Sequence, residues 1–312
     1  MTGAIRQLES GGAPSAGSKP RTSGGAASVD AQLGAGGVVS WAVAEHALQA
    51  AAASARHLWA RRLVSVYAIG SLAHGGFSPH VSDVDVALIL SDPLEAGDRS
   101  KVDGIPDRLR ESGSALAERV SVFWGSAATL GGGAAGGRFA AADRADLRQS
   151  GRLLWGRDIR DQVPAASLGE LIAEGAQLAL EKLATEQALA LLKDSAALAA
   201  GDVRRLTKWI LFPVRLLFTA RTAQIADHGT AVEHFCSVSS GAAVELARAA
   251  LDWRCAPPRD RNFAGLIDAG LLPLYRSFLD EYEPRVLSYG RFDLVSALRT
   301  WRKELVHAHG RA

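Results

Sequence analysis

The sequence is poor in cysteine, with only Cys236 and Cys255 in 312 residues. No CxxC pair or Cys/His cluster accompanies them, so the sequence does not encode a zinc site. Two widely spaced thiols in a chain of this length are typical of a reducing compartment rather than of a disulfide-stabilised secreted protein. The sequence therefore predicts a cytoplasmic protein with reduced thiols.

Long apolar runs are also absent. The longest, Trp209 to Phe218, is interrupted by Pro213 and Arg215, whereas a membrane helix needs about 20 largely apolar residues. Residues 1–10 contain no apolar segment of the kind found in secretory signals. We expect neither a membrane span nor a signal peptide.

An excess of charge of one sign is lacking as well. The 35 basic and 33 acidic residues leave a formal net charge of +2, and aromatic residues make up 6% of the chain. A dedicated nucleic-acid binder has a basic surplus, commonly with aromatic side chains among the basic ones. The composition therefore does not predict a nucleic-acid partner.

The organisation of the chain changes twice. Residues 1–37 are dominated by Gly, Ala, Ser and Pro, which predicts a disordered tail. Residues 38–164 mix helical and strand patterns, and residues 165–312 have helical periodicity almost throughout. The sequence predicts an α+β fold, with a small mixed-sheet domain followed by an α-helical bundle domain. We expect strands at 63–69, 84–90, 120–124 and 152–155, and helices at 38–62, 105–118, 143–149, 168–200, 202–226, 230–235, 241–252, 271–289 and 294–307.

The first predicted strand ends in a glycine and a serine. The apolar run from Leu63 to Ile69 is followed directly by Gly70-Ser71. Glycine lets the backbone turn tightly and approach a ligand, and the amide groups at the start of a following helix attract phosphate. Ser71 adds a hydroxyl donor at the same place. Gly70 and Ser71 are therefore candidate nucleotide-binding residues.

Two aspartates stand at the start of the second strand. Eleven residues separate Ser71 from the segment Asp83-Val84-Asp85. Alternation along a strand places both carboxylates on one face. Adjacent anions are stable mainly with a cation between them, and hard oxygen ligands suit magnesium. Asp83 and Asp85 are therefore candidate catalytic metal ligands that would contact a nucleotide. Either motif alone occurs in ordinary surface loops, whereas their combination indicates phosphate chemistry.

With these residues the sequence resembles the nucleotidyltransferases of the DNA polymerase β superfamily. Their signature is an apolar residue, Gly, then Gly or Ser, a short spacer, and two acidic residues flanked by apolar ones. The segment from Tyr67 to Asp85 looks most like the aminoglycoside adenylyltransferases that act on streptomycin and spectinomycin. Residues 151–156 resemble a strand and loop that follow in many of these enzymes, and 215–231 resemble part of their helical domain.

The resemblance implies a reaction and its ligands. A nucleoside monophosphate, AMP from ATP, would pass to a hydroxyl of a small-molecule acceptor, with an aminoglycoside as one candidate, and pyrophosphate would be released. Two Mg²⁺ ions would be held at Asp83 and Asp85. Residues 38–164 would form the nucleotidyltransferase domain, and residues 165–312 a helical domain that binds the acceptor. The protein would contribute positioning and charge neutralisation rather than covalent chemistry.

The sequence departs from the family pattern at the third carboxylate. Aligning the predicted strand at 120–124 with the family places Arg119 or Ser121 where a metal ligand or base is expected. Glu118 is the nearest acid and remains a catalytic candidate if a bulge corrects its phase, because a shift of one residue turns a side chain to the other face. Asp143 and Asp146 are other candidates for a base.

The helical domain departs from the pattern too. His228 stands where the resemblance would place a phosphate-binding lysine, and a histidine that is partly charged near neutral pH could take that role. An aminoglycoside is polycationic and calls for acidic pocket residues. The segment Asp280-Glu281-Tyr282-Glu283 is the only dense acidic cluster in this half of the sequence.

Three alternatives remain open from the sequence. The acceptor could be a protein side chain or an RNA end instead of a small molecule. The missing third carboxylate is also compatible with a degenerate nucleotide-binding module that has a regulatory role. Finally, Arg302 and His307 have the Arg-x4-His spacing of HEPN-type ribonucleases, although this spacing is common by chance.

Overall fold

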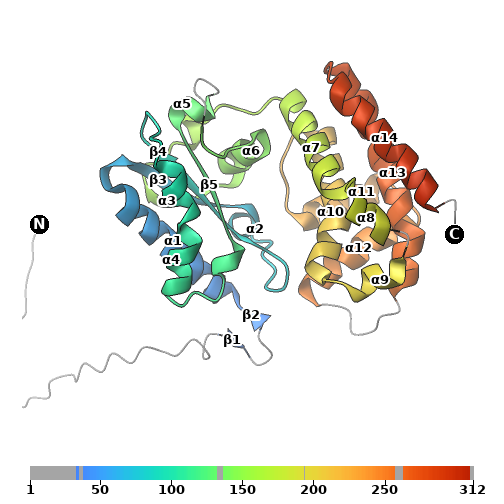
Figure 1. The fold of residues 1–312 in the computed structure, drawn as a ribbon, viewed down its shortest axis with the longest axis horizontal. Coiled ribbons are helices and arrows are strands. Elements are labelled where there is room, and N and C mark those ends of the chain that lie inside the picture. The colour runs from blue at the N-terminus through green and yellow to red at the C-terminus, as the bar shows by residue number, and fades with distance from the viewer. Residues whose placement is uncertain (1–32, 35–37, 132–135, 193, 257–262, 310–312) are drawn as a thin grey trace, which may run out of the picture.

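The computed structural model describes residues 33–34, 38–131, 136–192, 194–256 and 263–309. They form two parts with separate cores (Figure 1), a sheet with flanking helices and an assembly of helices. The elements of the first part are β1 (Leu33–Gly34), β2 (Val38–Val39), α1 (Trp41–Trp59), β3 (Leu63–Ile69), α2 (Gly70–His74), β4 (Val84–Leu90), α3 (Asp98–Asp103), α4 (Ile105–Glu111), β5 (Val120–Ser126), α5 (Ala127–Leu130), α6 (Ala141–Ser150) and β6 (Arg152–Gly156). Short 3-10 turns are η2 (Ala60–Arg62), η3 (Ala117–Arg119) and η4 (Arg160–Gln162).

The main sheet has the strand order β5-β4-β3-β6. Strand β4 is parallel to β5, while β3 is antiparallel to both β4 and β6. The sheet is therefore mixed, and the α+β class expected from the sequence is confirmed. Its register places Ile69 opposite Asp85 and Asp85 opposite Ser121.

Helices cover both faces of this sheet, so its central strands are almost wholly apolar. Helix α1 packs on β3 and β4 together with α4, and α6 packs on β3 from the other face. In β4 every residue is buried except Asp85. A single acid in an otherwise buried strand is costly to keep charged, which already marks Asp85 as unusual.

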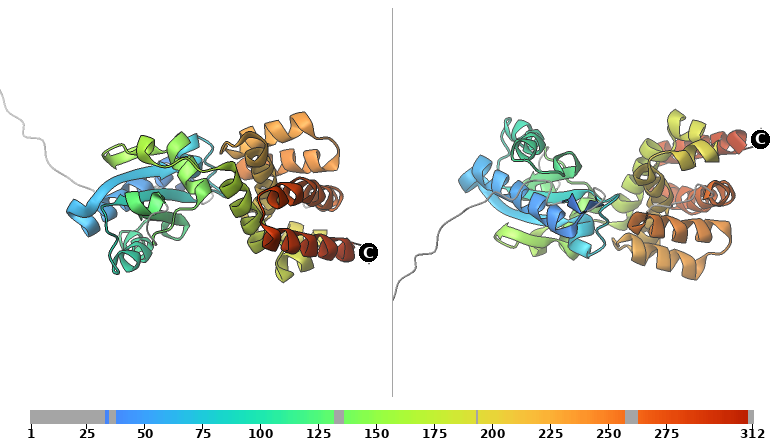
Figure 2. Two further views of the ribbon diagram at one scale, coloured as in Figure 1. Left: turned by 90° about the horizontal axis from the view of Figure 1, so that it is seen from above. Right: turned by 90° about the horizontal axis from the view of Figure 1, so that it is seen from below.

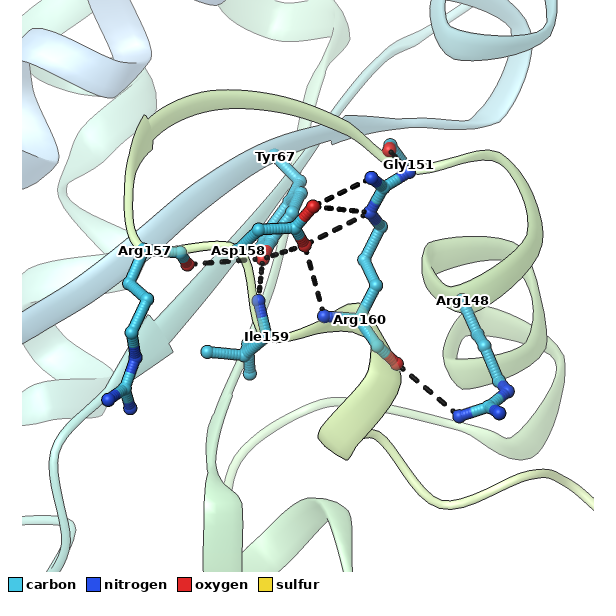
Figure 3. A network of polar contacts seen from close by, with 7 residues as sticks. All are labelled: Tyr67, Arg148, Gly151, Arg157, Asp158, Ile159 and Arg160. Carbon is cyan, nitrogen blue, oxygen red and sulfur yellow. Dashed lines mark hydrogen bonds and ion pairs between the residues drawn. The ribbon is translucent and has the colours of Figure 1, made fainter.

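A polar network ties the end of the sheet to the chain that leaves it (Figure 3). The Tyr67 hydroxyl accepts a hydrogen bond from the Ile159 amide at 2.7 Å and donates to Asp158 Oδ1 at 3.1 Å. Arg160 Nη2 donates to Asp158 Oδ2 at 2.7 Å, and Arg160 Nη1 donates to the Gly151 carbonyl at 3.0 Å. The network fixes the position of β3, which is followed directly by Gly70, relative to residues 157–167, which lead into the helical part.

Among the described residues of the second part every regular element is a helix, and each of the longer helices buries an apolar stripe. Its core contains a cluster of aromatic rings from two successive helices, among them Tyr275, Phe278 and Trp301. Its elements are α7 (Leu168–Leu183), α8 (Glu186–Leu191), α9 (Ser195–Ala200), α10 (Val203–Thr222), α11 (His228–Val238), α12 (Ala242–Cys255), α13 (Ala264–Ser288) and α14 (Phe292–His309).

The structure divides one helix expected from the sequence. Residues 168–200 form α7, α8 and α9 because Thr185 and Asp194 each cap a new helix by accepting a backbone hydrogen bond, at 3.1 Å and 2.8 Å. Most of the predicted tail, 1–37, lies outside the described residues, although Leu33–Gly34 pairs with Val38–Val39 as a short antiparallel ribbon.

The structure also bears on three further features of the sequence: its apolar segments, its two cysteines and the Arg-x4-His spacing. None of the helices within the described residues has both the length and the apolarity needed to cross a bilayer. Cys236 and Cys255 are both free thiols. Arg302 is engaged in ion pairs with Asp280 and Glu283, so this arginine of the Arg-x4-His spacing holds α13 and α14 together.

The two parts lie side by side with α7 at the junction (Figure 2). The Glu174 carboxylate of α7 accepts hydrogen bonds from the Ala141 and Ala142 amides at 2.8 Å and 3.2 Å, at the start of α6. Arg144 of α6 pairs with Glu170 at 2.8 Å. A carboxylate at a helix start is favoured by the free amides and the helix dipole. These contacts between α6 and α7 therefore fix the orientation of the helical part, including α10 to α12, relative to the sheet.

Candidate active site

Gly70 sits where no other residue fits. It follows β3 with a φ of +65°, a left-handed conformation that glycine adopts readily. A Cβ built on Gly70 would lie 2.3 Å from Asp85 Oδ2. The Asp85 carboxylate therefore lies directly against the Gly70 backbone, and the two halves of the sequence motif meet in space.

Asp83 and Asp85 flank the buried Val84 and approach each other closely enough to interact. Burial, followed by the charges of Asp83, Asp146 and Asp143, raises the pKa of Asp85 to about 7. Lys208 opposes this rise. A carboxyl group held among other carboxylates away from water is stabilised in its charged form by a bound cation, so the pair suits a divalent metal.

Asp146 of α6 completes this acidic corner, the group of Asp83, Asp85 and Asp146 around Gly70. Its Oδ2 accepts a hydrogen bond from the Gly70 amide at 2.8 Å, and its Oδ1 pairs with His74 Nε2. The Gly70 amide is therefore occupied, which corrects the expectation that it is free for phosphate. Gly70 instead makes room for Asp85, while the half-buried Ser71 follows at the same corner.

The other candidate base, Asp143, caps the start of α6 by accepting from the Ala140 amide at 3.1 Å. Burial is the largest cause that raises its pKa, to about 6, and the Asp146 charge contributes in the same direction. Asp143 therefore adds to the negative field at the corner, although its carboxylate is engaged in a helix cap.

Glu118 does not join the acidic corner. It lies in η3 before β5, its side chain is 77% exposed, and it pairs with Arg110 of α4. No bulge interrupts the β4–β5 pairing, which runs from Val84–Val120 onward. The sequence-based prediction of Glu118 as a catalytic acid thus finds no geometric support. The β-bulge that would turn its side chain to the same face as Asp85 is absent from this pair of strands.

Arg119 occupies the neighbouring position and has a structural task. Its guanidinium donates to the Pro79 carbonyl at 2.8 Å and to the Ser82 carbonyl. Both carbonyls belong to the loop 75–82, which connects the Gly70 corner to Asp83. Arg119 therefore holds this loop from the side of β5.

Arg254 of α12 holds the same loop from the helical part. Its Nη2 donates to Ser82 Oγ at 3.0 Å and to the Gly76 carbonyl at 3.4 Å, and the Ser78 hydroxyl donates to the Arg254 carbonyl. Burial and the nearby Arg215 lower the pKa of Arg254 to about 10. The loop that positions the aspartates is thus fixed jointly by both parts of the molecule.

Helix α10 presents basic side chains to the aspartates. Lys208 Nζ lies 2.9 Å from Asp83 Oδ2, and Arg204 pairs with Asp83 Oδ1. Arg215 lies seven residues after Lys208 on the same helix, and its positive charge lowers the pKa of both His228 and Arg254. Sequence analysis missed Arg204 and Lys208. Their i, i+4 spacing was visible, but periodicity alone does not show which surface a polar stripe faces.

His228 lies beside this basic stripe but in a different state from the one expected. It begins α11, and burial lowers the pKa of its imidazole well below the ordinary value, with Arg215, Arg254, Lys208 and His74 adding to the effect. Its buried Nδ1 has no hydrogen-bond partner among the described residues. His228 is therefore neutral at neutral pH, not the partly charged phosphate ligand that the sequence suggested.

We define the basic face as Lys208, Arg215 and Arg254 together with the neutral His228. Among the described residues, no carboxylate lies within ion-pair distance of Arg215 or Arg254. By contrast, Glu281 pairs with Arg221 and Arg285, and Asp280 and Glu283 pair with Arg302. The acidic cluster at 280–283 therefore forms ion pairs within the helical part. Within the described residues, Asp85 of the acidic corner has no ion-pair partner, and neither do Arg215 and Arg254 of the basic face, whereas Asp83 is paired with Arg204 and Lys208.

No protein-family model matches the chain, and no curated protein matches it in sequence. The fold is similar to that of the spectinomycin adenyltransferase AAD(9) from Enterococcus faecialis, whose crystal structure contains ATP and spectinomycin. The TM-score is 0.56 at 13% sequence identity, covering 77% of this chain and 99% of the other. At this identity the likeness shows a shared fold.

Proposed function

We propose that the protein is a metal-dependent nucleotidyltransferase that moves AMP from ATP to a hydroxyl group of a small molecule. The observation that carries the proposal concerns three charged groups without an ion-pair partner among the described residues. Asp85 lies against Gly70 with a pKa of about 7, and Arg215 and Arg254 lie on the basic face. Asp85 lacks a cation, and the two arginines lack an anion. Metal-bound ATP supplies both.

Asp83 and Asp85 would hold Mg²⁺, with water and phosphate oxygens completing the coordination. Within the described residues, no group of three His, Cys, Asp or Glu side chains is arranged to hold a metal by itself. Magnesium commonly binds through one or two carboxylates plus substrate phosphates, so two aspartates fit it. When bound, the metal would neutralise phosphate charge during transfer.

The chain's own residues would then divide the remaining tasks. Arg215 and Arg254 would bind the outer phosphates, and Ser71 would donate its hydroxyl to one of them. The neutral His228 can donate one hydrogen bond from its ring to a phosphate oxygen. Lys208 and Arg204 would move from Asp83 towards the nucleotide once a metal neutralises that carboxylate.

The transfer itself balances without a covalent enzyme intermediate. The acceptor hydroxyl oxygen forms a bond to the α-phosphorus, and the bond from that phosphorus to the bridging oxygen breaks. Pyrophosphate leaves with the electron pair, and the hydroxyl proton passes to water. Positioning and charge neutralisation account for this type of catalysis.

The test is transfer of label from α-radiolabelled ATP to a panel of hydroxylated acceptors, with pyrophosphate release measured in parallel. We expect both signals to require Mg²⁺ and to disappear in Asp83→Asn. If calorimetry detects no binding of Mg²⁺-ATP to the full chain, the proposal is wrong.

A second candidate function is nucleotide binding without transfer. Arg119 and Ser121 of the β5 region stand where an acid is expected from the family resemblance, and Ser121 is the residue opposite Asp85. Binding of Mg²⁺-ATP with no pyrophosphate release for any acceptor would favour this regulatory alternative over the enzyme.

A further inference from the structure

A cavity of about 240 Å³ opens on the helical part beside the acidic corner. Four of its lining side chains are basic, and they come from α7 (Lys182) and from the first turns of α10 (Arg204, Arg205 and Lys208). Asp202 is the only acid in the lining, and its carboxylate accepts from the Arg204 amide at 2.9 Å as a helix cap. The cavity is therefore positively charged.

The cavity adjoins the proposed reaction centre. Arg204 and Lys208 belong both to its lining and to the ion pairs with Asp83. A molecule bound here lies next to the aspartates, on the stripe of α10 that precedes Arg215. The basic face for the nucleotide phosphates begins further along the same helix, so the cavity is placed for the second substrate.

Its charge selects against a cationic acceptor. With Arg204 and Lys208 directed to Asp83 or to the nucleotide, Lys182 and Arg205 remain opposite Asp202, which leaves a net charge of +1. Like charges in a partly desolvated cavity repel, and they do so more strongly than in water. A polycationic aminoglycoside would meet this repulsion, whereas an anionic group would be attracted.

The geometry also fits an anionic group attached to a carbon skeleton. The Arg205 guanidinium lies 5.7 Å from the Trp209 ring centroid, and Phe212 adds a second aromatic side chain to the wall. The buried Nε of Arg204 has no hydrogen-bond partner in the part of the chain that the structure describes. Arginine donors arranged as a planar fork match carboxylate and phosphate oxygens, and aromatic rings pack against a ring or chain.

We infer that this cavity is the acceptor site and that the acceptor is a hydroxylated small molecule carrying a phosphate or a carboxylate. The inference deepens the proposed function and depends on it. The acceptor hydroxyl attacks the α-phosphorus as described above, while its anionic group stays on Lys182 and Arg205, away from the reacting atoms.

A matched ligand series tests the charge preference directly. Glucose, glucose 6-phosphate, gluconate and glucosamine share a hydroxylated skeleton and differ in charge, and spectinomycin adds a cationic antibiotic. Binding to the full chain is measured by calorimetry with Mg²⁺ and a non-hydrolysable ATP analogue present. We expect at least one of the two anions to bind ten-fold or more tightly than glucose, and glucosamine and spectinomycin to bind no better than glucose. The separate phosphate and carboxylate arms identify the preferred anion.

Charge reversal localises that preference. Lys182 is exposed on α7, so Lys182→Glu should leave the melting temperature unchanged and remove most of the advantage of the anion over glucose. Arg248→Glu, at an exposed position on α12 outside the cavity lining, should leave that advantage intact. The affinity for Mg²⁺-ATP should change less than three-fold in both variants.

The outcomes distinguish the inference about the acceptor from the proposed nucleotide transfer. Equal binding of glucose and both anions, or tighter binding of spectinomycin, overturns the inference about the acceptor while leaving nucleotide transfer intact. Loss of ATP affinity in Lys182→Glu overturns it too, because the cavity would then be part of the nucleotide site. A chain that fails to bind Mg²⁺-ATP at all overturns the proposed function itself.

Discussion

The acidic corner and the basic face differ in how the fold holds their charges in place. The corner is rigid, because Asp85 is part of a buried strand and Asp146 is hydrogen-bonded to the Gly70 amide. In the basic face, the α10 side chains Lys208 and Arg215 are long and partly exposed, whereas Arg254 of α12 is buried. The fold therefore holds Asp85 and Asp146 against the Gly70 backbone, whereas the side chains of Lys208 and Arg215 can change conformation.

This difference indicates which ligand each region meets. A metal ion requires ligands at nearly fixed distances, and a strand held by packing supplies them. Phosphate groups tolerate more variation and are well served by flexible lysine and arginine side chains. Arg204 and Lys208 connect the two regions, since their ion pairs with Asp83 provide positive charge at the carboxylate pair.

The largest expected effect comes from Asp85→Asn, which removes the charge from the rigid region. Transfer activity should fall by far more than the roughly 100-fold that loss of an outer-shell metal partner costs, because a direct ligand is lost. Label transfer from radiolabelled ATP measures this. Full retention of activity would remove Asp85 from the metal site.

The same variant should be more stable than the native chain at high pH. The folded-state pKa of Asp85, about 7, lies above the ordinary value of 3.8. The protonated carboxyl is therefore compatible with the fold at low pH, and stability is lost as the pH rises from about 4 through 7, at about 1.4 kcal/mol for each pKa unit. Asp85→Asn should raise the melting temperature at pH 8 and leave it unchanged near pH 4. Asp252→Asn, exposed on α12, serves as the control that should show neither change.

A smaller effect is expected from Arg254→Met, which weakens the connection between the two regions. Ser82 Oγ and the Gly76 carbonyl lose the guanidinium that donates to them, at a cost of about 2 kcal/mol. The freed loop 75–82 should also raise the Michaelis constant for ATP. Thermal unfolding and steady-state kinetics measure the two effects.

Two companion variants sharpen this experiment. Arg248→Met, on the exposed side of the same helix, should change stability by no more than about 0.5 kcal/mol. Arg254→Lys keeps the charge without the planar fork. If it restores ATP affinity but not stability, the charge acts on the phosphates and the fork on the loop. An unaltered Michaelis constant in Arg254→Met would confine this arginine to a structural role.

The acidic half of the site could be predicted from the sequence because its determinants are local. Strands β3 and β4 have the predicted bounds, 63–69 and 84–90, since both are apolar runs ended by clear breaks. The antiparallel pairing of those strands then brings Gly70 next to Asp85. A glycine after one strand and an acid at the start of the next are visible in the sequence, and the sheet needs no further information to join them.

The basic half could not be predicted in the same way. Helical periodicity identified the apolar stripe of α10, but the direction in which Arg204 and Lys208 point depends on how α6 docks on α7. That docking rests on Glu174 and Arg144, which have no local signature. The expected partial charge of His228 was wrong, because burial among arginines is a tertiary property, and its contact with phosphate stays a prediction.

The smallest expected effect is that of Glu118→Ala, the variant on which sequence and structure disagree most. An exposed pair such as Glu118 with Arg110 is screened by water and contributes little to stability, and no carboxylate of the acidic corner depends on it. Both the melting temperature and the rate of label transfer should therefore stay close to native values. Arg119→Ala, one residue further, should lower both, since the Pro79 and Ser82 carbonyls lose their donor. A large loss of activity in Glu118→Ala with an unchanged melting temperature would mean that β5 shifts its register when the nucleotide binds, and the acidic corner would then gain Glu118 as a fourth carboxylate.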